Sequence, residues 1–137
     1  MRSLPFARLT AVVCLLGIAV THLIDLPDKL REAHYMAAMF CALIVASLVL
    51  AAALTLGRHV QLALLAAGML SALTIIGYVL SRTVGLPQLE DHVGMWMDPV
   101  GIASLFVEAT LVGLAIPALP LPALDARAER PTRASAR

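Results

Sequence analysis

Residues 35–56 read YMAAMFCALIVASLVLAAALTL, a continuous apolar stretch without a single charged side chain. The hydrocarbon core of a bilayer is about 30 Å thick, and an α-helix needs about 20 apolar residues to cross it. Strands of an outer-membrane barrel are about half as long and alternate apolar with polar residues, so this stretch is not one of them. We therefore predict a membrane-spanning helix over residues 35–56.

Three other segments have the same character: residues 9–26, 60–80 and 99–121. Segment 60–80 has no charged residue, whereas 9–26 carries Asp25 near its end and 99–121 holds one acid, Glu108. In lipid a helix satisfies its own backbone hydrogen bonds, which an open strand or loop cannot do. The sequence thus predicts an all-α fold, an antiparallel bundle of four transmembrane helices that forms one domain over residues 1–121.

The composition of the whole chain agrees with this fold class. Of its 137 residues, 61% are hydrophobic and only 14% are charged, and the mean hydropathy is +0.90. Soluble globular domains are charged at about a quarter of their positions. The composition excludes an ordinary soluble enzyme, a disordered chain and a nucleic-acid-binding protein. Residues 122–137 differ from the rest, and we predict that they form a disordered basic tail.

Basic residues in the loops predict the orientation, because they concentrate on the cytoplasmic side. The count of basic residues on each side requires that the first helix stays in the chain. Segment 9–26 is followed by no small-residue cleavage site, so we expect an uncleaved helix and not a signal peptide. Seven basic residues then share one side of the membrane: Arg2, Arg8, Arg58, Arg127, Arg130, Arg133 and Arg137. The other side has three: Lys29, Arg31 and Arg82. We expect a multi-pass protein of the bacterial plasma membrane with both termini inside.

Small residues at helical spacing predict which faces pack, because close helix contacts in lipid favour small side chains. The expected stripe on 35–56 is Ala38, Ala42 and Ala46, and the one on 60–80 is Ala63, Ala67 and Ser71. On the last helix we expect Gly101, Leu105, Ala109 and Gly113, with Ser104 and Glu108 on an inward face shared with Gly101. Such stripes would equally suit a homodimer.

Four polar residues lie within or beside the outer ends of the predicted helices: His22, Arg82, Asp98 and Glu108. Glu108 comes nine residues after Pro99, so we expect it about 13 Å below the outer surface. Acids in membranes usually face the bundle interior and have a partner. His22 is expected about 6 Å deep, within joint side-chain reach of Glu108. The sequence predicts a polar cluster here, which could be a proton or cation site or a structural network.

A second group of residues has the ligand types that copper(I) prefers, imidazole and thioether. His92, Met95 and Met97 lie in the second outer loop, and His34 opens the second helix on the same side. These four residues form a candidate metal site. A haem held between His22 and an outer histidine is the related alternative.

Two motifs resemble a family of small four-helix integral membrane proteins of high-GC actinobacteria. They are Ser81–Pro87 followed by Asp98-Pro-Val-Gly and Glu108, and His22 followed by Leu26-Pro-Asp. The likeness covers about residues 20–116, and it implies an architecture and no activity. Members of that family more often have Pro-Glu-His where this chain has Pro27-Asp28-Lys29, which weakens any metal-binding role for this loop.

Three functions from different classes follow as hypotheses. The first is a small non-enzymatic membrane protein, an accessory or interaction subunit whose partner is another membrane protein or a second copy of itself. The second is a membrane redox module that binds copper or haem. The third is an oligomeric proton-coupled transporter of small molecules that uses Glu108.

Overall fold

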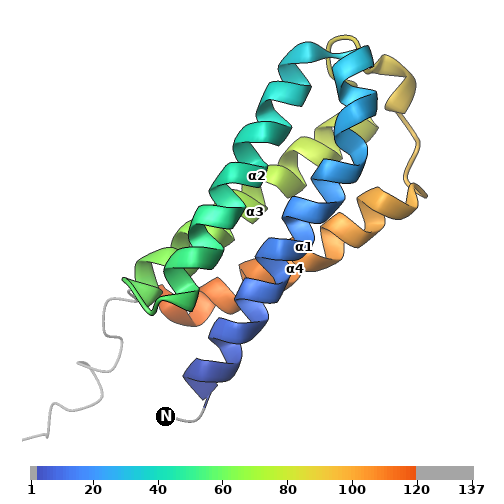
Figure 1. The fold of residues 1–137 in the computed structure, drawn as a ribbon. Helices are drawn as coiled ribbons and strands as arrows, with labels where there is room; N and C mark the ends of the chain where they lie inside the picture. The colour runs from blue at the N-terminus through green and yellow to red at the C-terminus, as the bar shows by residue number, and fades with distance from the viewer. Residues whose placement is uncertain (1–2, 120–137) are drawn as a thin grey trace, which may run out of the picture.

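The structure is a computed structural model that describes residues 3–119, and this part of the chain is helical with short connections (Figure 1). It has four α-helices and two short 3-10 turns: α1 (Ser3–Glu32), α2 (His34–Thr55), α3 (Val60–Thr83), η1 (Glu90–His92), α4 (Pro99–Ala115) and η2 (Ile116–Ala118). All four α-helices, α4 together with η2, are long and apolar enough to cross a membrane. The prediction of an all-α fold with four helices long and apolar enough to span a membrane is confirmed.

The bundle has two ends with different connections (Figure 1). We call the end with Ala33, between α1 and α2, and residues 84–98, between α3 and α4, the loop end. At this end the Tyr35 hydroxyl donates to the Pro87 carbonyl oxygen at 2.8 Å. We call the opposite end, with residues 56–59 and η2, the turn end. There Gln61 donates to the carbonyl oxygen of Ala118 at 3.0 Å, which joins α3 to η2.

Neighbouring helices form a closed ring around one core. α1 packs most extensively on α2 and also on α4, α3 packs on α4, and α2 meets α3 over a smaller area. Within the described residues, α2 and α4 make no close backbone approach, so they stand at diagonal corners. The largest fully buried side chains occupy the centre of this ring: Leu15, Ile18, Leu54, Leu111, Glu108, Ser47 and Ser71.

Large apolar side chains cover the outside of every helix. Val13, Val45, Met69 and Phe106, one from each helix, are between 59% and 74% exposed. This arrangement would be unstable in water but suits hydrocarbon, which is as apolar as the side chains themselves. The outer surface of the bundle is therefore built to contact lipid.

α1 is longer than predicted, because it begins six residues earlier and continues six residues beyond Leu26. Pro27 lies inside the helix. A proline removes one backbone hydrogen bond, but membrane helices tolerate this loss where neighbouring groups compensate. The regular hydrogen-bond pattern of the helix resumes after Pro27, and at its end the Ala33 N–H donates to the Lys29 carbonyl oxygen at 3.0 Å. The predicted outer loop between the first two helices is thus reduced to a single residue.

α4 ends at Ala115, short of the predicted boundary at residue 121, and η2 follows it. Pro117 cannot continue a regular helix, which explains the early end. The predicted disordered tail, residues 122–137, lies outside the described residues.

The inward faces agree with the predicted stripes on α3 and differ on α2. Ala63, Ala67 and Ser71 are buried as expected. On α2, Ala38 and Ala42 are exposed, and the inward face is instead formed by Ala37, Leu43, Ser47, Ala51 and Leu54. On α4, Gly101, Ser104 and Glu108 are buried as expected, whereas Ala109 and Gly113 face outwards.

The contact between α3 and α4 generates a prediction about Gly68. A Cβ atom at Gly68 would collide with the Cβ of Ala115, whereas one at Gly77, on the same helix, would meet nothing within 4 Å among the described residues. We expect Gly68→Ala to lower the free energy of unfolding by about 1–3 kcal/mol, because the two helices must separate. Gly77→Ala should change it little. Thermal unfolding of both variants in detergent measures the difference, and equal melting temperatures would contradict this packing.

Candidate functional site

Arg82 and Asp98 are brought together at the loop end, where α3 ends and α4 begins. Arg82 lies in the last turn of α3 and is only 8% exposed. Its Nη2 is 3.6 Å from Oδ2 of Asp98, and its guanidinium carbon lies 4.8 Å from the ring centroid of Tyr78. A cation over an aromatic face is stabilised by the ring quadrupole. The cation is thus held between a carboxylate and an aromatic ring.

Asp98 also caps α4. Its carboxylate accepts hydrogen bonds from the backbone N–H groups of Val100 at 3.3 Å and Gly101 at 3.1 Å. The negative charge also suits the positive end of the helix dipole. Pro99 takes the first helical position, where its missing N–H leaves no bond unmade. A Cβ at Gly101 would lie 2.6 Å from a ring carbon of Tyr78, so only glycine permits this approach of α3 to α4.

A second group of charges lies beside this pair. Lys29, 5% exposed, donates to the carboxylate of Glu32 one helical turn later. Nε2 of His92, in η1, is 3.6 Å from Oε2 of the same carboxylate. Sequence reasoning missed this group, because Lys29 and Glu32 were expected in a loop. The i, i+3 spacing of Lys29 and Glu32 could have indicated the pair. This spacing brings two side chains together only on a helix, so it indicates a contact only if α1 continues through Pro27.

Backbone hydrogen bonds hold the loop over these side chains. The Gly94 N–H donates to the Arg82 carbonyl oxygen at 2.9 Å, and the Tyr78 hydroxyl donates to the Trp96 carbonyl oxygen at 3.3 Å. We call the five charged or titratable residues beneath the loop the loop-end cap: Lys29, Glu32, Arg82, His92 and Asp98. The cap joins α1, α3, η1 and the start of α4.

Glu108 lies deeper, near the centre of the bundle. It is 1% exposed, and its Oε1 accepts a hydrogen bond from the Ser104 hydroxyl at 2.8 Å. The i, i+4 spacing puts both side chains on the inward face of α4. The partner that an intramembrane acid requires is therefore on its own helix.

His22 has different partners. Its Nδ1 is 3.0 Å from the Ile18 carbonyl oxygen, and its ring meets Phe40 edge-on with centroids 4.7 Å apart. Because α1 ends at Glu32, His22 lies about 15 Å from the end of the helix, deeper than the 6 Å expected. Gly17, whose Cβ would lie 3.2 Å from Val107, sets the level of α1 against α4.

The expected polar cluster is therefore divided. From the Gly17–Val107 contact, His22 and Glu108 are about 9 Å apart along the bundle axis. Arg82 and Asp98 belong to the loop-end cap, Glu108 is bonded to Ser104, and His22 is bonded within α1.

The candidate copper ligands are spread over the loop end. His34 is exposed at the start of α2, His92 faces Glu32, and Met95 and Met97 are 55% and 83% exposed. Between residues 3 and 119, no group of three or more His, Cys, Asp or Glu side chains is placed to hold a metal ion. Copper or haem binding stays a prediction.

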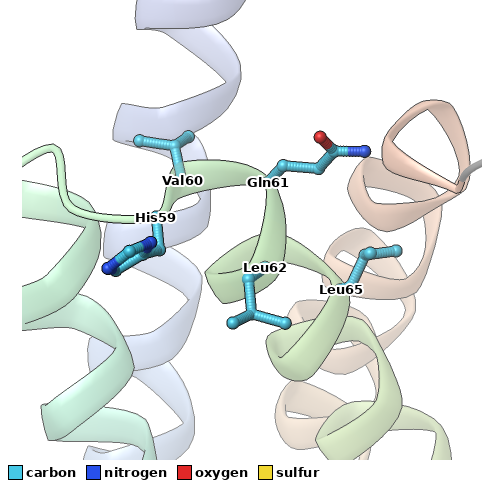
Figure 2. Close-up of a pocket in the computed structure, with 5 residues that line it drawn as sticks. All are labelled: His59, Val60, Gln61, Leu62 and Leu65. Carbon is cyan, nitrogen blue, oxygen red and sulfur yellow. The ribbon is translucent and has the colours of Figure 1, made fainter.

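Open hollows occur at the turn end, far from these residues. One of them has a volume of about 440 Å³ and is lined by His59, Val60, Gln61, Leu62 and Leu65, which are drawn as sticks in Figure 2. It lies where α3 begins, and His59 adopts a left-handed backbone with φ 46° there. This hollow shares no residue with the loop-end cap or with the surroundings of Glu108.

The Arg82–Asp98 pair can be tested with a double-mutant cycle. Asp98→Asn keeps a capping oxygen but removes the charge, so Arg82 loses its counter-ion in a buried position. We expect a loss of about 1–3 kcal/mol in the free energy of unfolding. Arg82→Met should then cost less in the Asp98→Asn background than in the wild type. Chemical or thermal unfolding in detergent measures all four proteins, with the exposed Asp91→Asn as control. Additive losses would mean that the two side chains do not interact.

The surroundings of His92 predict that the stability of the folded protein depends on pH. Burial lowers the pKa of His92 from its ordinary value of 6.5, the charges of Lys29 and Arg82 lower it further, and Glu32 and Asp25 oppose the shift. The unfolded chain then binds this proton more readily than the folded one, so stability falls as the pH drops through 6.5. We expect His92→Gln to lose less stability than the wild type between about pH 7 and pH 5. Melting temperatures over that range measure it, with the exposed His34→Gln as control. Parallel curves for wild type and His92→Gln would exclude this origin.

Comparison of the chain with protein-family models, with curated proteins and with solved structures finds no match.

Proposed function

We propose that this chain is a non-enzymatic integral membrane protein that acts as an accessory subunit of another membrane protein. Its four helices run antiparallel across the bacterial plasma membrane, with both termini in the cytoplasm and the loop end outside. The loop-end cap positions the surface that contacts the partner.

The charge distribution supports this orientation. Arg8 and Arg58 lie at the turn end, where Arg8 donates to the Thr55 carbonyl oxygen at 3.1 Å. Six of the acidic side chains lie at or near the loop end: Asp25, Asp28, Glu32, Glu90, Asp91 and Asp98. The loop end itself carries three basic residues: Lys29, Arg31 and Arg82. The bias therefore comes from the whole sequence, in which seven basic residues fall in the segments predicted on the turn-end side, five of them before residue 3 or after residue 119. Because Lys and Arg near the helix ends concentrate on the cytoplasmic side, this count supports the turn end as the inner one.

The observation that carries the proposal is the apolar tip of the loop above the cap. Val93, Met95, Trp96 and Met97 are between 43% and 83% exposed. The charged groups of the loop-end cap pair with one another, whereas these four apolar side chains are exposed beside Glu90 and Asp91 of the same loop. Tryptophan and methionine are enriched at protein interfaces, and a tip at the membrane boundary reaches a neighbouring membrane protein more readily than a soluble one.

The two other functions of different class stay predictions. Copper or haem binding would use the histidines and methionines of the loop end. Proton-coupled transport would use Glu108, whose surroundings are considered separately below.

Site-directed cross-linking tests the proposal. A membrane-impermeant maleimide that carries a photoreactive group is attached to Met97→Cys in intact cells, with Cys14 and Cys41 replaced by serine. We expect labelling from outside, because the tip is extracellular, and a discrete covalent adduct with a second membrane protein after illumination. Mass spectrometry of the adduct identifies the partner.

Two matched variants control this experiment. Asp91→Cys is exposed in the same loop but outside the tip, so it should be labelled equally and yield much less adduct. His59→Cys at the turn end should be labelled only after permeabilisation. Equal adducts from positions 91 and 97 would refute the tip as the interface, and an adduct of twice the chain's mass would replace the partner with a second copy. Labelling of position 59 in intact cells would reverse the orientation.

A further inference from the structure

Two buried serines in the middle of the bundle lack a hydrogen-bond partner within the part of the chain that the structure describes. Ser47 on α2 and Ser71 on α3 are 0% exposed, and neither Oγ has a hydrogen-bond partner among the described residues. The other hydroxyls of helical residues 5–118 behave differently. Each threonine, and Ser81, donates to a carbonyl oxygen of its own helix. An unmet buried hydroxyl is unfavourable, so these two serines require a separate explanation.

Contacts between α3 and α4 place Ser71 level with Glu108. A Cβ at Gly68 would meet Ala115 and lie 3.6 Å from the Leu111 carbonyl oxygen, and Tyr78 faces Gly101. These contacts bracket both residues, and they put Ser71 and Glu108 within about one helical turn of each other along the axis. Both belong to the buried faces of their helices.

Contacts of α1 place Ser47 at the same level. His22 faces Phe40, and Arg8 reaches Thr55, so Ser47 falls opposite residues 15–16 of α1. The Gly17–Val107 contact puts Glu108 opposite the same part of α1. Each helix thus contributes one fully buried side chain to a central layer: Leu15, Ser47, Ser71 and Glu108.

The layer has polar surroundings on one side only. Towards the loop end, Ser104 follows one turn from Glu108, and beyond it the Tyr78 hydroxyl lies 3.1 Å from a Cβ built at Gly101, beside Asp98. Towards the turn end the buried side chains are apolar: Leu54, Leu64, Ala67, Leu111 and Ala115. Polar groups therefore lead from Glu108 to the loop-end cap, whereas an apolar plug separates it from the turn end.

Among residues 3–119, no Lys, Arg or His side chain forms an ion pair with the Glu108 carboxyl group. On the two helices packed against α4, the titratable groups on either side of Glu108 along the axis are Cys14 and His22 on α1 and, towards the loop end, Tyr78 and Arg82 on α3. Among residues 3–119, the one side chain that hydrogen-bonds to Glu108 is Ser104. A hydroxyl can donate to a carboxylate or accept from a carboxylic acid. If Glu108 were always protonated, the Ser104 hydroxyl alone would be a sufficient hydrogen-bond partner. Two further hydroxyls at the same level along the bundle axis would allow both the carboxylic acid and the carboxylate to be solvated.

We propose that Glu108, with Ser104, Ser71 and Ser47, forms an intramembrane proton-binding site that exchanges with the loop-end side alone. The carboxylate takes the proton of a hydronium ion, releases water and becomes a neutral acid, and the hydroxyls stabilise each form in turn. This site is independent of the proposed accessory function, because none of its residues belongs to the loop tip.

Infrared spectroscopy of the full chain in lipid nanodiscs tests the site. We expect a C=O stretch of a protonated carboxylic acid that disappears as the pH is raised and is missing in Glu108→Gln. In the proposed site, the Ser71 hydroxyl donates to the carboxylate once the proton has left. With Ser71→Ala the charged form loses this donor, so the band should persist to a pH about one unit higher. Thr74→Ala, one turn away with its hydroxyl bonded to the Leu70 carbonyl oxygen, is the matched control and should leave the midpoint unchanged.

A second measurement tests the direction of exchange. Vesicles with the loop end outside are selected by biotinylation of Asp91→Cys, and the external pH is changed rapidly. The Glu108 band should respond before the internal pH equilibrates. A band that never changes with pH, or that is identical in wild type and Ser71→Ala, would make Glu108 a fixed structural acid and overturn the proposal. A response that follows only the internal pH would overturn exchange at the loop end.

Discussion

The start of α4 depends on one carboxylate, and much of the bundle depends on the start of α4. Asp98 accepts two backbone hydrogen bonds that begin the helix, and it also faces the buried guanidinium of Arg82. These two roles fix α4 against α3 at the point where Gly101 meets Tyr78. The rotation of α4 set there directs Ser104 and Glu108 inwards.

The charged residues at the end of the bundle are paired, whereas the acid in its centre has no charged partner among the described residues. At the loop end, oppositely charged groups lie beside one another at the boundary of the apolar region, where partial hydration limits the cost of burying them. In the centre, the described residues place one buried acid, Glu108, which is bonded to one hydroxyl and lies level with two more. A cap of paired charges stabilises the arrangement of helices, whereas an isolated acid among hydroxyls is a place where a proton can be gained or lost.

The apolar outer surface of the bundle does little to determine how the four helices pack. Large apolar side chains are exposed on the outside of each helix, and lipid would be as apolar as they are, so their burial adds little preference for one helix rotation over another. Close contacts of small residues and a few polar bonds must then select the packing. Gly68 against Ala115, Gly101 against Tyr78 and Gly17 against Val107 are such contacts, and all three involve glycine.

The sequence by itself determined the four helices, their order and the asymmetric distribution of charge, because apolar length and loop charge are local properties. It also predicted the inward face of Gly101, Ser104 and Glu108, since an acid in hydrocarbon must turn inwards. Only the tertiary structure decided that α1 continues through Pro27, which pairs Lys29 with Glu32 and lowers His22 into the bundle. It also decided that Ser47 and Ser71 lie level with Glu108, while Ala38 and Ala42 face outwards. The physical reason is that both faces of a membrane helix are apolar, so rotation and level are set by contacts with other helices.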